Sequence, residues 1–283
     1  MRSSARITLC ALAVLIAGCG TDNDAPSFTP PSSNSEGATH IHGLGINPAD
    51  DSLFIATHTG LFRAAAGEGQ ARRVGDGTQD TMGFTVTGAD EFLGSGHPDV
   101  RDSHPPLLGL IRSADAGRTW DPVSLLGKAD FHVLRTAGSR IYGVNATDGR
   151  LMVSSDGGRT WARRTPPSEL IDLAADPRDA DRIIASGEDR LMRSADAGQT
   201  WRPLSRRAGL LAWPARRGPY LVDGTGLVWT TSDGGRGWEQ IGDVGGAPAA
   251  LATHDDDLYV ALHTNEIKVS QDGGRTWTLR AQS

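Results

Sequence analysis

The chain has 283 residues, of which 22% are charged and 36 are glycine, and its formal net charge is −6. That length holds one large all-β domain or two ordinary ones. No stretch keeps an apolar period of 3.6 residues, which argues against a mainly helical protein, and the acidic balance argues against a nucleic-acid partner.

The N-terminus has the pattern of an export signal. Arg2 and Arg6 precede an apolar run over residues 7–17, and Gly18 stands directly before Cys19. This pattern predicts a lipoprotein signal peptide over residues 1–18, with acylation of the Cys19 thiol after cleavage. The alternative is an ordinary secretory signal with an incidental cysteine. The apolar run is too short for a spanning helix.

The segment that follows is a predicted tether. Residues 19–38 are rich in Thr, Asp, Asn, Pro, Ser and Gly, a composition typical of a flexible linker. The second cysteine, Cys10, lies within the signal, so the mature chain is expected to have no disulfide. These features predict a protein of the bacterial cell envelope, held by lipid to the outer face of a membrane.

One pattern, Ser/Thr-x-Asp-x-Gly-x-x-Trp, recurs five times, at 113–120, 154–161, 194–201, 231–238 and 270–277. In the fourth copy Thr231 replaces the serine and Gly237 replaces the usual threonine. The tryptophans are 41, 40, 37 and 39 residues apart, so each copy belongs to one structural unit.

The pattern itself predicts a tight hairpin turn. The Ser and Asp side chains bond nearby backbone groups, the Gly takes a positive φ without penalty, and the Trp supplies a large buried surface. Three alternating apolar stretches precede each copy and one strand follows it. Four antiparallel strands per forty residues are typical of a propeller blade.

The first unit lacks this turn but shows comparable strands at 42–46, 52–57, 60–63 and 72–74. The prediction is therefore an all-β, six-bladed β-propeller over residues 39–283. Its blades are expected at 39–80, 81–127, 128–166, 167–206, 207–244 and 245–283.

With these repeats the chain resembles the Asp-box, or BNR, propellers, which include sialidases and assembly factors. The segments H-I-H-G-L-G at 40–45, A-T-H-T-G-L-F at 56–62, M-G-F at 82–84 and S-G-H-P-D at 95–99 are similar to bacterial lipoproteins labelled glycosylhydrolase or exo-α-sialidase by similarity. The resemblance implies that the repeats are structural turns away from any active site. Their structural residues would be Asp115, Trp120, Asp156, Trp161, Asp196, Trp201, Asp233, Trp238, Asp272 and Trp277.

Sialidase activity itself is not expected. The family uses an arginine triad, a Tyr/Glu nucleophile pair and an Asp acid, yet residues 35–42 contain no arginine. Tyr142, Tyr220 and Tyr259 all lie in predicted second strands. For another glycoside hydrolase, Glu188 and Asp223 are the candidate carboxylates by position, with solvated loop acids as the alternative.

The histidines gather on one predicted face. Seven of the eight fall on loops or strand entries around one end of the channel, and only His254 maps to the other end. Clustered imidazoles favour copper or zinc, and Asp99 and Asp102 could assist them. The alternative is that these loop positions merely tolerate polar residues. The candidate ligands are His40, His42, His58, His97, His104, His132 and His263.

Three functions remain open from the sequence. The first is a binding or assembly module, because a propeller mouth is a ready concave site and no complete catalytic set is visible. Its partner would be an unidentified ligand, a glycan or an envelope protein. The others are a metal-binding envelope protein and a glycoside hydrolase. The sharpest expectation is that His42, His58, His97 and His263 approach one site.

Overall fold

The computed structural model describes residues 40–283, which form 24 strands in six four-stranded antiparallel sheets. The predicted six-bladed all-β propeller is thereby confirmed. The predicted signal, Cys19 and tether lie outside the described residues. Within them, no helix is long and apolar enough to cross a membrane.

Each sheet is continuous in the chain. The first three blades contain β1 (Ile41–Asn47), β2 (Ser52–Thr57), β3 (Gly60–Ala64) and β4 (Arg72–Arg73); β5 (Asp80–Gly88), β6 (Glu91–His97), β7 (Leu110–Ser113) and β8 (Asp121–Ser124); and β9 (Phe131–Ala137), β10 (Arg140–Asn145), β11 (Arg150–Ser154) and β12 (Ala162–Arg164).

The last three blades follow the same order. They contain β13 (Asp172–Asp176), β14 (Asp179–Ser186), β15 (Leu191–Ser194) and β16 (Arg202–Ser205); β17 (Leu210–Ala212), β18 (Tyr220–Val222), β19 (Leu227–Thr230) and β20 (Glu239–Asp243); and β21 (Pro248–His254), β22 (Asp257–Leu262), β23 (Glu266–Ser270) and β24 (Thr278–Gln282).

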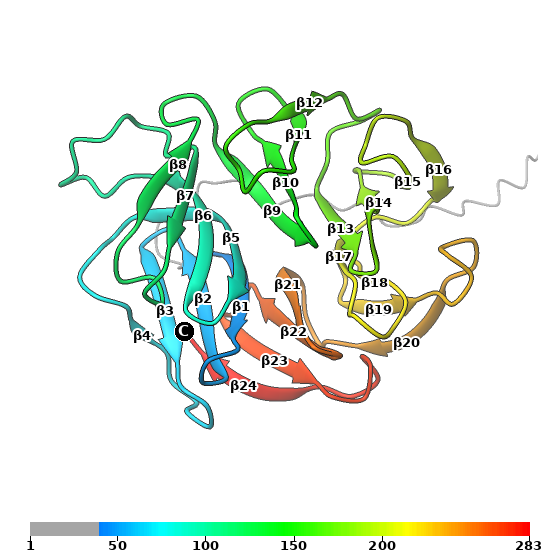
Figure 1. Ribbon diagram of the computed structural model, residues 1–283. Coiled ribbons are helices and arrows are strands. Elements are labelled where there is room, and N and C mark those ends of the chain that lie inside the picture. The colour runs from blue at the N-terminus through cyan, green and yellow to red at the C-terminus, as the bar shows by residue number, and fades with distance from the viewer. Residues whose placement is uncertain (1–39) are drawn as a thin grey trace, which may run out of the picture.

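The first strand of every sheet lines a central channel, as Figure 1 shows. Each inner strand contacts the next one around the ring, and β21 contacts β1. Most second strands are deeply buried, because neighbouring blades cover both of their faces. All six residues of β2 are buried. The outer strands face water, and both residues of β4 are exposed. The core therefore lies between blades.

The repeated pattern forms the same turn each time, called here the repeat turn. In the second copy the Ser154 hydroxyl donates to Asp156 Oδ1 over 2.8 Å and accepts from the Gly158 N–H over 2.9 Å. Asp156 also accepts from the N–H and the hydroxyl of Thr160. Gly158 has a φ of 85°, which explains the glycine. The side chain thus satisfies the turn's backbone donors.

The tryptophans of the repeat turns are partly buried, with most of each side chain covered. Trp161 packs against Phe131 with ring centroids 4.9 Å apart, and its Nε1 donates to Ser124 Oγ of the preceding blade. Each of these tryptophans packs against a core cluster at a blade junction. Their role is to join one blade to the previous one.

The ring closes between the first and last blades without exchange of a strand. Gln70, just before β4, pairs in parallel with Gln282 of β24. The Ala71 N–H donates to the Gln282 carbonyl, and the Gln282 N–H donates to the Gly69 carbonyl. Behind this pairing, β1 and β21 share one apolar cluster that includes Leu44. The segment before β4 therefore covers part of the edge of β24.

Candidate functional site

The central channel holds a cavity of about 820 Å³. We call the mouth the end at which the inner strands begin; the repeat turns lie at the other end. Five predicted ligands line this cavity: His40, His42, His58, His132 and His263. The cavity also reaches His254. This residue is the last of β21 and lies at the other end of the channel, the position that the sequence predicted for it.

β-Bulges in the inner strands set the direction of two of these histidine side chains. The pairing of β1 with β2 shifts between Ile41 and Gly43, which leaves His42 as the extra residue of a β-bulge. The pairing of β9 with β10 shifts in the same way at His132. Met82 holds this position in the blade between them. A bulge redirects its side chain, so the alternation of a regular strand does not decide where the ring of His42 points.

Two glycines next to these bulges bring adjacent blades close together. A Cβ on Gly43 would lie 3.0 Å from Cβ of Phe84 in the next blade. A Cβ on Gly83 would collide with the Phe131 carbonyl oxygen in the blade after that. The backbones of the first three blades therefore approach closely at the mouth. Side chains from separate blades then meet there.

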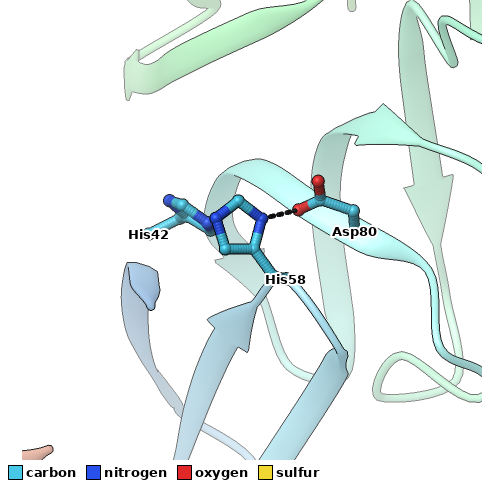
Figure 2. Close-up of side chains that lie close together, drawn as sticks. All are labelled: His42, His58 and Asp80. Carbon is cyan, nitrogen blue, oxygen red and sulfur yellow. Dashed lines mark hydrogen bonds and ion pairs between the residues drawn. The ribbon is translucent and has the colours of Figure 1, made fainter. Parts of the chain in front are cut away.

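The first half of the resulting cluster contains His42, His58 and Asp80, which Figure 2 shows. One ligand atom from each residue lies within 4.8 Å of the other two. The His42 and His58 rings meet edge to face with centroids 4.2 Å apart. His58 Nδ1 lies 3.0 Å from Asp80 Oδ1. These residues come from β1, the β2–β3 loop and the start of β5.

The second half continues from Asp80 into the third blade. His97 Nδ1 lies 3.3 Å from Asp80 Oδ2, and its Nε2 lies 3.7 Å from Asp130 Oδ2. His132 Nε2 lies 2.9 Å from the same Asp130 oxygen. Imidazoles and carboxylates therefore alternate across three blades. We call these six residues the mouth cluster: His42, His58, Asp80, His97, Asp130 and His132.

Burial differs sharply within the mouth cluster. The side chains of His58, His97 and His132 are 41–43% exposed, whereas that of Asp130 is only 7% exposed. Burial, and next the nearby His58, lower the pKa of His42 to about 3. His42 is thus neutral at pH 7, the form in which imidazole binds metals. Its Nε2 is buried and has no hydrogen-bond partner.

The other predicted ligands lie outside the mouth cluster. The His40 ring lies tilted beside that of His58, with centroids 5.5 Å apart. His263 lines the same cavity and interacts electrostatically with His40, but the close group does not include it, so the expected convergence of four histidines is only partly met. His104 is exposed, 4.0 Å from Asp102, and is not among the residues that line the cavity.

Two aspartates were missed by the sequence reasoning. Asp80 and Asp130 orient the histidines, whereas Asp99 accepts hydrogen bonds from Thr78 and Arg101 instead. The sequence position of Asp130 could have identified it. Asp130 stands two residues before His132, as His40 stands two residues before His42, at the entry to an inner strand. Only histidines were mapped onto that position.

The candidate catalytic carboxylates differ in their surroundings. Glu188 is exposed and lines the cavity. Asp223 is buried, so the alternative interpretation of this residue as a solvated loop acid is wrong. Its carboxylate accepts hydrogen bonds from Thr225 and from Trp229 Nε1. The carboxylate of Asp223 therefore organises the β18–β19 loop. The three tyrosines are buried, as their second-strand positions predicted: Tyr142, Tyr220 and Tyr259.

No family model and no curated protein matches this chain in sequence. Among solved structures it is similar to YCF48 bound to a D1 peptide, with 15% identity, a TM-score of 0.54, and coverage of 86% of this chain and 81% of that one. It is also similar to YCF48 from Cyanidioschyzon merolae, with 15% identity, a TM-score of 0.52, and coverage of 87% and 86%.

The third similar structure is a GH74 xyloglucanase from Xanthomonas campestris, with 20% identity, a TM-score of 0.55, and coverage of 86% of this chain. This chain spans only 45% of that enzyme. One neighbour thus binds a peptide and another is a glycoside hydrolase, so the shared feature is the fold and not the activity. The chain is a six-bladed β-propeller whose fold is similar to those of YCF48 and GH74 proteins.

Proposed function

We propose that this chain is a lipid-anchored binding module of the bacterial cell envelope that binds a divalent transition-metal ion, copper or zinc, at its mouth. The observation that carries the proposal is the convergence of His42, His58 and Asp80, with one ligand atom of each within 4.8 Å of the others. Imidazole and carboxylate are ligands that both ions accept.

The charges and hydrogen bonds around these residues favour a cation. Among the described residues, the ion-pair partners of Asp80 are imidazoles and not lysine or arginine. His42 contributes a buried nitrogen without a partner, which is costly unless something binds it. Asp80 lies near His58 with one oxygen and near His97 with the other, so its carboxylate is a common neighbour of both rings.

Calorimetric titration of the purified full-length chain with Zn²⁺ and with Cu²⁺ tests the metal site. His58→Ala is expected to weaken binding more than about 100-fold, since even outer-shell partners contribute about 10–100-fold. His104→Ala is the matched control, because His104 is exposed and outside the mouth cluster, and it should leave the affinity unchanged. Absence of uptake, or equal losses in both variants, would refute the proposal.

The anchor needs its own experiment. Cys19→Ser should move the chain from the membrane fraction to the soluble fraction, because one residue carries the predicted lipid. The same variant should bind metal with unchanged affinity, which would show that membrane anchoring and metal binding are independent properties. Retention on membranes without lipid would contradict this part of the proposal.

A glycoside hydrolase is the second candidate, and the exposed Glu188 beside the cavity is the observation that favours it. A screen of sialosides and aryl glycosides decides between the two. Turnover that is lost in both Glu188→Gln and Asp223→Asn would favour the enzyme. For the binding module we expect no turnover in the unaltered chain.

A further inference from the structure

The second half of the mouth cluster has its own set of ligand atoms. Nε2 of His97 and Nε2 of His132 face the same oxygen, Asp130 Oδ2, at 3.7 and 2.9 Å. Two ligand atoms about 2.0–2.1 Å from one tetrahedral ion are about 3.3 Å apart. The two observed distances lie on either side of that value. Among the described residues, only the ligand atoms of His42, His58 and Asp80 all lie within 4.8 Å of one another. A single ion beside Asp130 therefore requires the half-exposed His97 and His132 rings to rotate toward each other.

The Asp130 carboxylate is the independent sign of a ligand here. Its side chain is 7% exposed, and its Oδ1 is buried with no hydrogen-bond partner. Its ion-pair partners in the described chain are His97 and His132 alone. A buried carboxylate needs a hydrogen-bonded donor or a positive charge. His132 Nε2 lies at hydrogen-bond distance from Oδ2, whereas Oδ1 has no donor. A divalent cation beside the carboxylate would supply the missing positive charge.

His97 connects the two halves of the mouth cluster. Its Nε2 faces Asp130, while its Nδ1 lies 3.3 Å from Asp80 Oδ2. Metal-binding histidines commonly donate their other ring N–H to a carboxylate, which fixes the tautomer and the ring orientation. Asp80 therefore has two partners with different roles. Its Oδ1 belongs to the first site, and its Oδ2 orients a ligand of the second.

We propose that the mouth holds two metal ions, the first at His42, His58 and Asp80 and the second at His97, His132 and Asp130. This inference rests on the proposed function, since it adds a second ion beside the first. The His42 and His132 positions are equivalent bulges in blades one and three. Each site is thus built around one bulge histidine and completed from the blade between them.

Metal content per chain is the decisive measurement. The full-length chain is loaded with Zn²⁺, passed through a desalting column and measured by elemental analysis; two ions per chain are expected. His132→Ala and His58→Ala should each retain one ion, and the double variant should retain none. His104→Ala is the control and should keep both ions.

Loading with Cu²⁺ gives a second readout. Two neighbouring Cu²⁺ ions should couple and weaken the electron paramagnetic resonance signal, and His132→Ala should restore the spectrum of one isolated ion. One ion per chain, unaffected by His132→Ala but lost in His58→Ala, would refute the second position and leave the proposed function intact. No bound metal at all would refute both. If His132→Ala fails to fold, the isosteric Asp130→Asn replaces it, with the same loss of one ion expected.

Discussion

The repeat-turn end of the propeller and its mouth use polar side chains differently. At the repeat turns, the same Ser-to-Asp and Gly-to-Ser hydrogen bonds recur from blade to blade, as at Asp115 and Asp272. At the mouth, equivalent bulge positions hold His42, Met82 and His132 in three successive blades. Repetition at one end serves the fold, and variation at the other end leaves a site that is assembled only once.

The two ends also differ in how fully their polar atoms are hydrogen-bonded. The aspartate of the repeat turn accepts several hydrogen bonds, and its pKa is lowered in all five turns. The mouth retains buried atoms without partners on His42 and Asp130. Unsatisfied buried groups lower stability, so His42 and Asp130 carry a cost that the aspartates of the repeat turns do not. In the repeat turns the corresponding unpaired atom is Nε1 of Trp201.

Acid should have the largest effect, because it acts on all five repeat turns together. Hydrogen bonds from Thr200 and Ser194 lower the pKa of Asp196 to about 2, from an ordinary 3.8. A lowered folded-state pKa gives stability that is present above the unfolded value and lost as pH falls toward the folded value. The free energy of unfolding in urea should therefore fall between about pH 4 and pH 2. A flat profile there, or one unchanged by Asp196→Asn, would contradict the role assigned to these turns.

Among the single substitutions, Trp277→Ala should lower the free energy of unfolding most. Trp277 packs against the cluster between blades five and six, and its Nε1 donates to the Gly274 carbonyl over 3.2 Å. We expect a loss of about 3 kcal/mol in the free energy of unfolding. Trp277→Phe should lose less, because it keeps most of the packing. Metal affinity should stay at its original value, and a large fall in it would show that the two ends are coupled.

His42→Leu should have the opposite sign. It removes a buried nitrogen without a partner and keeps an apolar side chain of similar size in the cavity wall. The metal-free protein should gain about 1 kcal/mol in its free energy of unfolding. The same variant should lose the stabilisation that Zn²⁺ gives the unaltered chain. Destabilisation without metal would mean that His42 serves the fold.

Gly237→Thr should have the smallest effect. The repeat turn of blade five lacks the threonine whose hydroxyl bonds the aspartate elsewhere, and the Gly237 N–H bonds both Asp233 oxygens instead. Restoring the hydroxyl should raise the free energy of unfolding by about 0.5 kcal/mol. Thr160→Gly is the reverse exchange in another turn and should lower it by a similar amount. If both variants unfold at the same thermal midpoint as the unaltered chain, the threonine does not stabilise the repeat turn.

The sequence alone determined the repeat turns and, through them, the fold. A hairpin turn is a local structure, so Ser154, Asp156 and Gly158 carry the information for it within five residues. The forty-residue spacing then fixed the number of blades. The burial of Tyr142 followed equally from its place in a second strand. The sequence also placed histidines at the correct end of the channel, because strand order alone decides which end a loop occupies.

Only the tertiary structure decided which of those histidines meet, and which carboxylates join them. His42 and His132 are aimed by bulges, and a bulge is a shift between two strands that neither strand's own pattern shows. Asp80 contacts His58 because Gly43 and Gly83 let three blades approach closely. His263 lies equally at the mouth but remains outside the group. Side-chain contacts between blades depend on distances of a few ångströms, and a repeat period of forty residues does not specify them.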